Sequence, residues 1–345
     1  MSGYPIDRAC YRTLDPDWEG EVVIADIDRT YLATRFSSMK GMLRIPFERA
    51  AQKRDIEGMA RLLRELRRGP GRMTRDTPLF FLSASPKQLR PVIERKMGLD
   101  GISFDGTTFK DWGRVLRAGR PKRITEQIGF KITALLTSRS HMPVGAHELL
   151  LGDDLETDPI TYGLYADALA GRIPTSDLAR VLRRNGVAHA DAAHIERLRR
   201  ELQPGRGVRK AFIRLERHQD SDDFLEFGPG VIGCRGAFQM VVVHWRMGLV
   251  SLSGVGRVAA ALASRGVSPD SLGRRMHDLR RRAMIDADEV EPVLATVREH
   301  GVDMEDQAMP QPDARWVKVW QRSEDRVWTP EAYVCLLYTS DAADE

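Results

Sequence analysis

The chain has 345 residues, 42% hydrophobic and 30% charged, which predicts a globular protein with a sizeable core in one large domain or two. Its formal net charge is only +4, and acidic residues interleave with the arginines of its helices, so a nucleic-acid partner is disfavoured. Three cysteines without a spacing pattern argue against a disulfide framework or a zinc site. No signal peptide or apolar run of about 18 residues is found, so we expect a cytoplasmic location.

The first half of the chain alternates short apolar runs with amphipathic segments. Strands are expected where β-branched or apolar runs end in polar residues, at 21–28, 78–85 and 147–154. Helices are expected where apolar residues recur at helical spacing, at 55–69, 87–98, 123–139 and 158–171. This alternation predicts an α/β fold with a doubly wound parallel sheet, filling residues 20–172 after an N-terminal extension at 1–19.

The second half, residues 173–334, has a different texture. After two helices comes a basic hinge at 203–210, then an alternating strand at 210–218. Residues 236–301 read as mostly helical, and 309–316 resembles a linker. We therefore expect a mainly helical C-terminal region with one or two strands, whose role the sequence does not reveal. Trp316 and Trp320, four residues apart, fit a small packing face.

The last residues, 335–345 (CLLYTSDAADE), back-translate codon for codon into a commonly used sequencing-library adapter. Such segments are excluded from structural argument. We expect the natural sequence to end near Val334, so that Cys335 is not a biological cysteine.

Polar side chains follow each of the three strong strands, at the point where each strand ends. They are Asp26, Asp28 and Thr30 after the first strand, Ser83 and Ser85 after the second, and Asp153 and Asp154 after the third. Because the carboxyl ends of parallel strands share one edge of a sheet, these side chains are expected to converge on one crevice. The helix before the third strand adds Lys131.

This set of residues suits phosphoryl transfer. Carboxylates bind the hard Mg²⁺ ion through oxygen, and a carboxylate can attack phosphorus to form an aspartyl-phosphate. A metal ion and a lysine supply the positive charge that attack of one anion on another requires. A second carboxyl group can protonate the leaving alkoxide and later activate water.

Four segments resemble, in order, the motifs of haloacid-dehalogenase (HAD) superfamily phosphatases: VVIADIDRT, FFLSAS, GFKITALL and LLLGDDLETDP. Within that superfamily the chain most resembles the catalytic domain of actin-patch-type phosphatidate phosphatases, through SASP, FK and the GDD….DP..Y ending. The resemblance covers residues 20–172. It implies a HAD-like Rossmannoid fold and a Mg²⁺-dependent hydrolase acting on a phosphomonoester, with a phosphatidate-like lipid phosphate as the leading substrate.

The resemblance implies a role for each chemical residue. Asp26 would be the nucleophile and Asp28 the general acid/base. Ser83 would bind the transferring phosphoryl group, and Lys131 would neutralise charge between nucleophile and phosphate. Ser85 competes with Ser83 for its role.

The resemblance also implies a metal site. Asp153 would complete the Mg²⁺ site beside Asp26 and the backbone carbonyl of Asp28. Supporting residues would steady the loop or orient Lys131 and metal-bound water: Thr30, Asp154 and Asp158. Asp158 is equally well suited to be a helix N-cap, and Lys110 and Lys122 compete with Lys131.

Departures from the family pattern concern the substrate rather than the chemistry. Ala84 stands where the phosphatidate phosphatases have asparagine, and Arg29 replaces their usual acidic residue. The alternatives are a phosphatase or phosphotransferase for a soluble phosphomonoester, and a catalytically silent HAD-like scaffold. Residues 31–77 hold a loop-rich flap without a large folded cap, which leaves the site open to bulky phosphorylated substrates and, for a lipid, to peripheral membrane contact.

Two further motifs are decoys. The stretch DIDRTYLATRFS lacks the glycine and glutamate of a calcium loop, because Tyr31 and Ser37 stand at those positions. Gly254 and Gly256 form part of a G-x-G-x-x-A run, but no second strand with an acidic residue follows. We expect these glycines to break or pack helices.

Overall fold

The protein is described by a computed structural model that covers residues 4–33, 54–117, 119, 126–203, 205, 207–216, 220–304 and 308–321. Most of the predicted flap, the competing lysine Lys122 and the predicted adapter segment 335–345 lie outside these residues.

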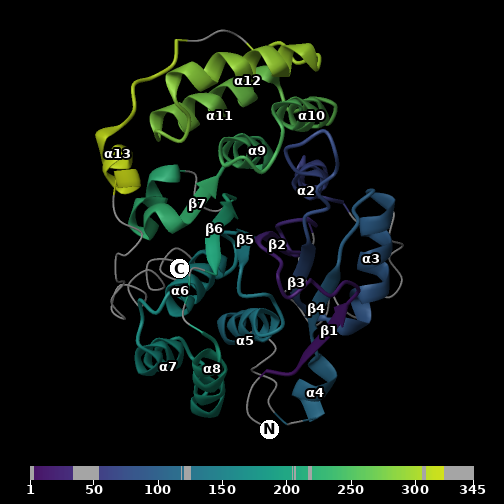
Figure 1. Cartoon of the computed structure of the whole chain (residues 1–345), viewed down its shortest axis with the longest axis vertical. Helices are drawn as coiled ribbons and strands as arrows, with labels where there is room; N and C mark the ends of the chain where they lie inside the picture. The colour runs from purple at the N-terminus through teal and green to yellow at the C-terminus, as the bar shows by residue number, and fades with distance from the viewer. Residues whose placement is uncertain are drawn as a thin grey trace.

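A seven-stranded sheet forms the centre of the molecule, in the order β1-β4-β3-β2-β5-β6-β7 (Figure 1). Its strands are β1 (Ile6–Cys10), β2 (Gly20–Asp26), β3 (Leu79–Pro86), β4 (Gly106–Lys110), β5 (Ala146–Asp153), β6 (Val208–Arg214) and β7 (Val231–Cys234). Strand β1 pairs antiparallel with β4, and every other pairing is parallel. This arrangement confirms the predicted α/β class with a largely parallel, doubly wound sheet.

Strand β2 lies between β3 and β5, so the chain winds outward from it in both directions. The carboxyl end of β2 is therefore the topological switch point, where open α/β sheets place their ligands. The predicted strands at 21–28, 78–85 and 147–154 correspond to these three neighbours.

Helices cover both faces of the sheet, and alternate residues of each strand enter two separate cores. In β2, Val23 and Ala25 face one core, and Val22 and Ile24 face the other. The first core is covered by α2 (Met59–Arg68), α3 (Arg90–Leu99), α9 (Ala237–Arg246), α10 (Leu252–Ala263), α11 (Pro269–Arg281) and α12 (Ala287–Glu299). The second is covered by α5 (Ile128–Arg139), α6 (Asp158–Leu169), α7 (Thr175–Arg184) and α8 (His189–Glu201).

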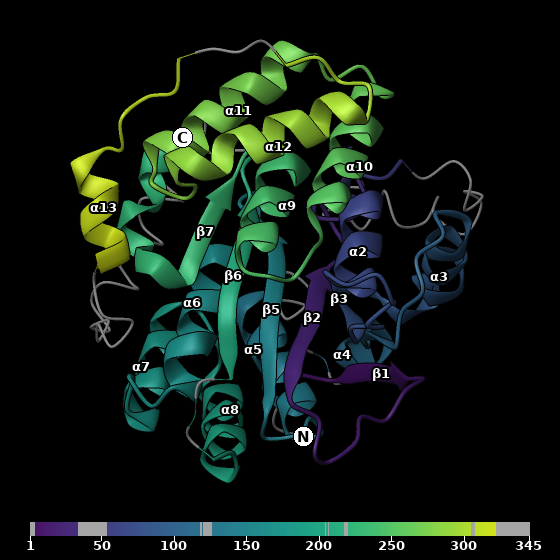
Figure 2. The ribbon, with the colours of Figure 1, turned by 45° about the horizontal axis from the view of Figure 1, so that its top comes forward.

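The second half of the chain is built into the same sheet. Strands β6 and β7 extend it beyond β5, and α9 and α10 pack beside α2 on one face (Figure 2). The two strands and the many helices agree with the expected content of residues 173–334. The expected division at residue 172, however, does not coincide with an edge of the sheet.

The remaining elements are two short helices and two 3₁₀ segments. They are α4 (Trp112–Arg117), α13 (Ala314–Gln321) and the 3₁₀ segments η3 (Lys87–Leu89) and η5 (Ser221–Gly230). In α13 the rings of Trp316 and Trp320 stack with their centroids 6.0 Å apart, which confirms a packing face.

The glycines of α10 serve helix packing, as predicted. A Cβ on Gly256 would lie 2.3 Å from His300 Nδ1, and one on Gly254 would lie 2.6 Å from Val250 Cγ1. Within the described residues, no helix has the length and apolar character to cross a membrane.

Candidate functional site

The carboxyl ends of β2, β3 and β5 bring the predicted polar side chains together, because these strands are parallel neighbours at the switch point. Helix α5 supplies the lysine and α6 a further carboxylate. The side chains that meet here are all buried: Asp26, Asp28, Ser83, Ser85, Lys131, Asp153 and Asp158.

Asp26 is the last residue of β2 and is completely buried. Its Oδ1 lies 3.0 Å from the ammonium Nζ of Lys131, yet neither carboxylate oxygen accepts a hydrogen bond from the described part of the chain. Burial raises the pKa of Asp26 well above its usual range, and the nearby Lys131 only partly opposes this. Asp26 is therefore a buried carboxyl group that is paired with Lys131 through Oδ1 and accepts no hydrogen bond from the described residues.

Asp28 is held by two serines of β3. Ser83 Oγ donates to Asp28 Oδ2 at 2.7 Å, and Ser85 Oγ donates to the same oxygen at 2.9 Å. The other oxygen, Oδ1, accepts no hydrogen bond from the described residues. Burial raises the pKa of Asp28 to about 7, although the serine hydroxyls act in the opposite direction. From the sequence, we expected only one of the two serines to take the phosphoryl-binding role. In the structure, both hydroxyls donate to Asp28.

Lys131 lies in the first turn of α5 and is completely buried among carboxylates. Its Nζ is 3.0 Å from Asp26 Oδ1, 3.0 Å from Glu156 Oε2, and in direct contact with Asp158 Oδ1. Burial lowers the pKa of Lys131, but the carboxylates outweigh burial and raise it overall. Lys131 is thus an ammonium ion at the centre of an anionic cluster.

Glu156 was missed by sequence reasoning. Its position in the sequence could have indicated it, since Glu156 lies in the turn between Asp153 and Asp158 that follows β5.

Of the lysines that competed with Lys131 for the charge-neutralising role, Lys110 donates to the backbone carbonyl of Glu126 at 2.7 Å.

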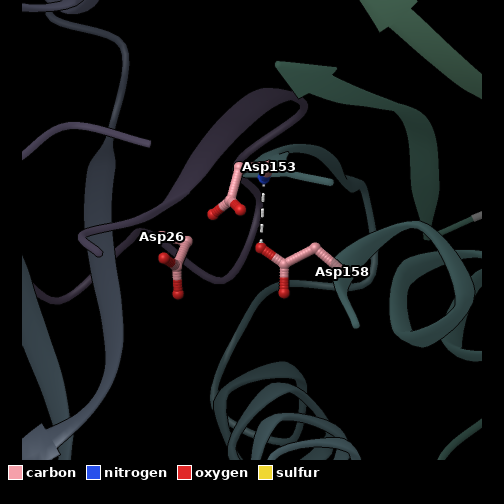
Figure 3. A group of neighbouring side chains, drawn as sticks. All are labelled: Asp26, Asp153 and Asp158. Atoms are coloured by element: carbon pink, nitrogen blue, oxygen red, sulfur yellow. Dashed lines mark hydrogen bonds between the residues drawn. The ribbon is translucent and has the colours of Figure 1, made fainter. Parts of the chain in front are cut away.

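Three carboxylates could hold a metal ion. Asp26, Asp153 and Asp158 each offer an oxygen atom, and these atoms lie within 4.8 Å of one another (Figure 3). Oxygen donors of this kind suit a hard divalent cation such as Mg²⁺. Burial, followed by the charge of Asp158, raises the pKa of Asp153 to about 8.

Asp158 is already engaged through both of its oxygens. Oδ1 contacts Lys131, and Oδ2 accepts a hydrogen bond from the backbone N–H of Asp153 at 3.3 Å. It does not cap α6, whose N-cap is Thr157. A Cβ on Gly152 would lie 2.4 Å from Asp158 Oδ2, so the glycine makes this close approach possible. Asp158 therefore contacts both Lys131 and the end of β5, whereas neither oxygen of Asp26 accepts a hydrogen bond from the described residues.

The supporting residues take different positions. Thr30 Oγ1 donates to Asp153 Oδ2 at 3.4 Å and so links the loop after β2 to the end of β5. Asp154 Oδ1 accepts from the backbone N–H of Glu216 at 2.7 Å, which connects it to the chain beyond β6.

The comparison with known families agrees with this geometry. Residues 21–176 match the family model described as the phosphatidate phosphatase APP1 catalytic domain. No curated protein and no solved structure shows a significant match to the chain. The match confirms the resemblance to phosphatidate phosphatases and supports a phosphatase activity for this segment. The mostly parallel sheet is consistent with a HAD-type Rossmann-like fold.

Proposed function

We propose that the chain is a Mg²⁺-dependent HAD-type phosphatase, which hydrolyses a phosphomonoester through an aspartyl-phosphate on Asp26. The observation that carries the proposal is the state of Asp26, which is buried beside the Lys131 ammonium and accepts no hydrogen bond from the described residues at either carboxylate oxygen. The ammonium of Lys131, 3.0 Å away, offsets the repulsion between the carboxylate and an anionic phosphate.

The reaction proceeds in two displacements. In the first, an Asp26 oxygen bonds to phosphorus, the ester P–O bond breaks, and Asp28 gives its proton to the leaving oxygen. In the second, Asp28 takes a proton from water, the water oxygen bonds to phosphorus, and the bond between Asp26 and phosphorus breaks. Phosphate is released and Asp28 is again protonated. Its pKa of about 7 suits a group that gives and takes a proton near neutral pH.

Asp26 and Asp153 would hold Mg²⁺, with the backbone carbonyl of Asp28 as a further ligand. The fit rests on the oxygen-only donor set, on the closeness of the carboxylates and on the orphaned oxygens of Asp26. When bound, the ion would supply positive charge to the phosphoryl oxygens. Ser83 would donate its hydroxyl to the same phosphoryl group.

The test of the activity is Mg²⁺-dependent phosphate release from p-nitrophenyl phosphate by wild type, Asp26→Asn and Asp270→Asn. Asp270 is exposed in the first turn of α11 and provides a matched control for the same chemical change. We expect the Asp26 variant to lose activity and the Asp270 variant to keep it. Equal rates in wild type and Asp26→Asn, or no release by either, would refute the mechanism and favour a silent scaffold.

The leading substrate is a phosphatidate-like lipid phosphate, because of the family match. Peripheral contact with a membrane would then bring the site to its substrate. Phosphate release from phosphatidate in mixed vesicles, measured beside a panel of soluble phosphomonoesters, separates the two substrate classes. Hydrolysis of soluble esters without hydrolysis or sedimentation with phosphatidate vesicles would favour a soluble phosphomonoester.

A further inference from the structure

The carboxyl end of β6 contacts both acidic segments of the site, although it lies beyond the matched residues 21–176. Arg214, the last residue of β6, is paired with Asp153 in the parallel register. The backbone N–H of Asp154 donates to the carbonyl oxygen of Arg214 at 3.2 Å. Two residues later, the N–H of Glu216 donates to Asp154 Oδ1 at 2.7 Å. This part of the chain therefore holds the turn that follows β5.

The same segment reaches the loop after β2 through its side chains. Arg214 Nε donates to the backbone carbonyl of Arg29 at 2.9 Å, and its Nη2 is ion-paired with Glu216. Glu216 also accepts from Arg29 Nη1 at 3.3 Å. One carboxylate and one guanidinium thus connect the end of β6 to the residue that follows Asp28.

The loop needs such support because its backbone is strained. Arg29 has a φ of 61°, in the left-handed region that side-chain-bearing residues adopt only when their surroundings hold them there. Within the loop, the N–H of Arg29 donates to the carbonyl of Leu32 at 2.8 Å, and the N–H of Tyr31 donates to that of Ile27 at 3.1 Å. The bond from Arg214 adds an anchor from outside the loop, at the strained residue itself.

We infer that Arg214 and Glu216 are positioning residues, which fix the loop carrying Asp28 relative to the turn carrying Asp154. The segment beyond residue 176 then completes the site rather than merely extending the sheet. The expected effect of Arg214 on the rate of phosphate release rests on the proposed function, whereas its expected effect on the mobility of the loop after β2 does not. Removing a group that holds site residues in place without touching the substrate typically lowers activity by about 10- to 100-fold.

Hydrogen–deuterium exchange on the whole protein tests the loop directly. In Arg214→Ala we expect exchange of the amides at 27–33 to rise about tenfold, because a charged hydrogen bond to the loop is lost. The core amides of β3 and β5 should exchange as in wild type. Arg274→Ala is the matched control, since Arg274 is exposed and paired with Asp270 on α11. It should change neither exchange nor activity.

Two further variants separate the parts of the contact. Glu216→Ala removes the carboxylate that accepts from Arg29 and pairs with Arg214 but keeps the bond from Arg214 to the Arg29 carbonyl, so loop exchange should rise, although less than in Arg214→Ala. Arg214→Lys keeps the charge and one donor but cannot serve two acceptors as a guanidinium does, so it should restore part of the protection.

Kinetics give a second readout. Arg214→Ala should lower kcat for p-nitrophenyl phosphate by about 10- to 100-fold, with a smaller change in KM. Wild-type loop exchange in Arg214→Ala would overturn the inference, as would increased exchange spread evenly over the core strands. Failure of the proposed function has a different signature, because wild type would then show no Mg²⁺-dependent hydrolysis while loop exchange still responded to Arg214→Ala.

Discussion

Replacing Lys131 by methionine would leave the buried carboxylates of Asp26 and Asp158 and the partly exposed one of Glu156 without their shared cation. The ammonium lies 3.0 Å from both Asp26 and Glu156 and touches Asp158. Removing one partner of a buried ion pair costs about 3–5 kcal/mol of the free energy of unfolding. We therefore expect a loss of this size at pH 8 in the absence of metal, together with loss of phosphatase activity.

The loss of stability should depend on pH. Lys131 holds the pKa values of Asp26 and Asp158 down, so its removal raises them further. As the pH falls, these groups take up protons more readily in the folded variant than in the unfolded chain. Each proton taken up offsets about 1.4 kcal/mol of the loss per pH unit. The stability difference between Lys131→Met and wild type should therefore shrink between pH 8 and pH 5.5.

Urea unfolding with excess EDTA, at pH 8 and pH 5.5, measures this difference without interference from bound metal. Lys318→Met is the matched control, because Lys318 is exposed on α13. It should unfold as wild type at both pH values. A Lys131→Met variant with the same stability loss at both pH values would refute the reasoning about the carboxylates, and one as stable as wild type would refute the ion-pair argument.

Other perturbations probe separate parts of the structure. Burial raises the pKa of Glu148 from 4.5 to about 7, so its folded form retains a proton that the unfolded chain releases, and wild-type stability should fall by up to about 3 kcal/mol as the pH rises through this window. Because Asp28 and Asp153 add a slope of the same sign, Glu148→Gln should reduce rather than abolish the slope in urea unfolding between pH 4.5 and 7.5, and an unchanged slope would contradict the assignment. Ser85→Ala removes one of the two hydroxyl donors to Asp28 and should lower kcat about tenfold for an alkyl phosphate but little for p-nitrophenyl phosphate, whose leaving group needs no proton. Equal losses on both esters would point to a role other than positioning the acid. Gly152→Ala places a Cβ 2.4 Å from Asp158 Oδ2, so it should lower the free energy of unfolding by about 1–3 kcal/mol in thermal or urea unfolding and reduce phosphatase activity. Wild-type stability and activity in this variant would show that β5 can shift to make room for the methyl group.

The main residues of the candidate site could be predicted because their signal is local. A buried parallel strand is an apolar run, and the polar residues that end it lie at the ligand-binding edge whatever the rest of the fold does. The strand-end position alone was enough to predict Asp26, Ser83 and Asp153. Strands β1 and β4 were missed because their sequences, IDRAC and GTTFK, lack the apolar runs that the other strands have.

The sequence by itself determined the three central strands of the sheet and the residue types at their carboxyl ends. Only the tertiary structure decided what those residues do to one another. Both serines reach Asp28 because β3 pairs with β2, and Lys131 lies among three carboxylates because α5 packs against α6. The contacts of Arg214 with the loop after Asp28 join segments that are 185 positions apart. No local pattern encodes such a pairing, because it depends on which strand lies beside β5 and on the register in which the two strands align.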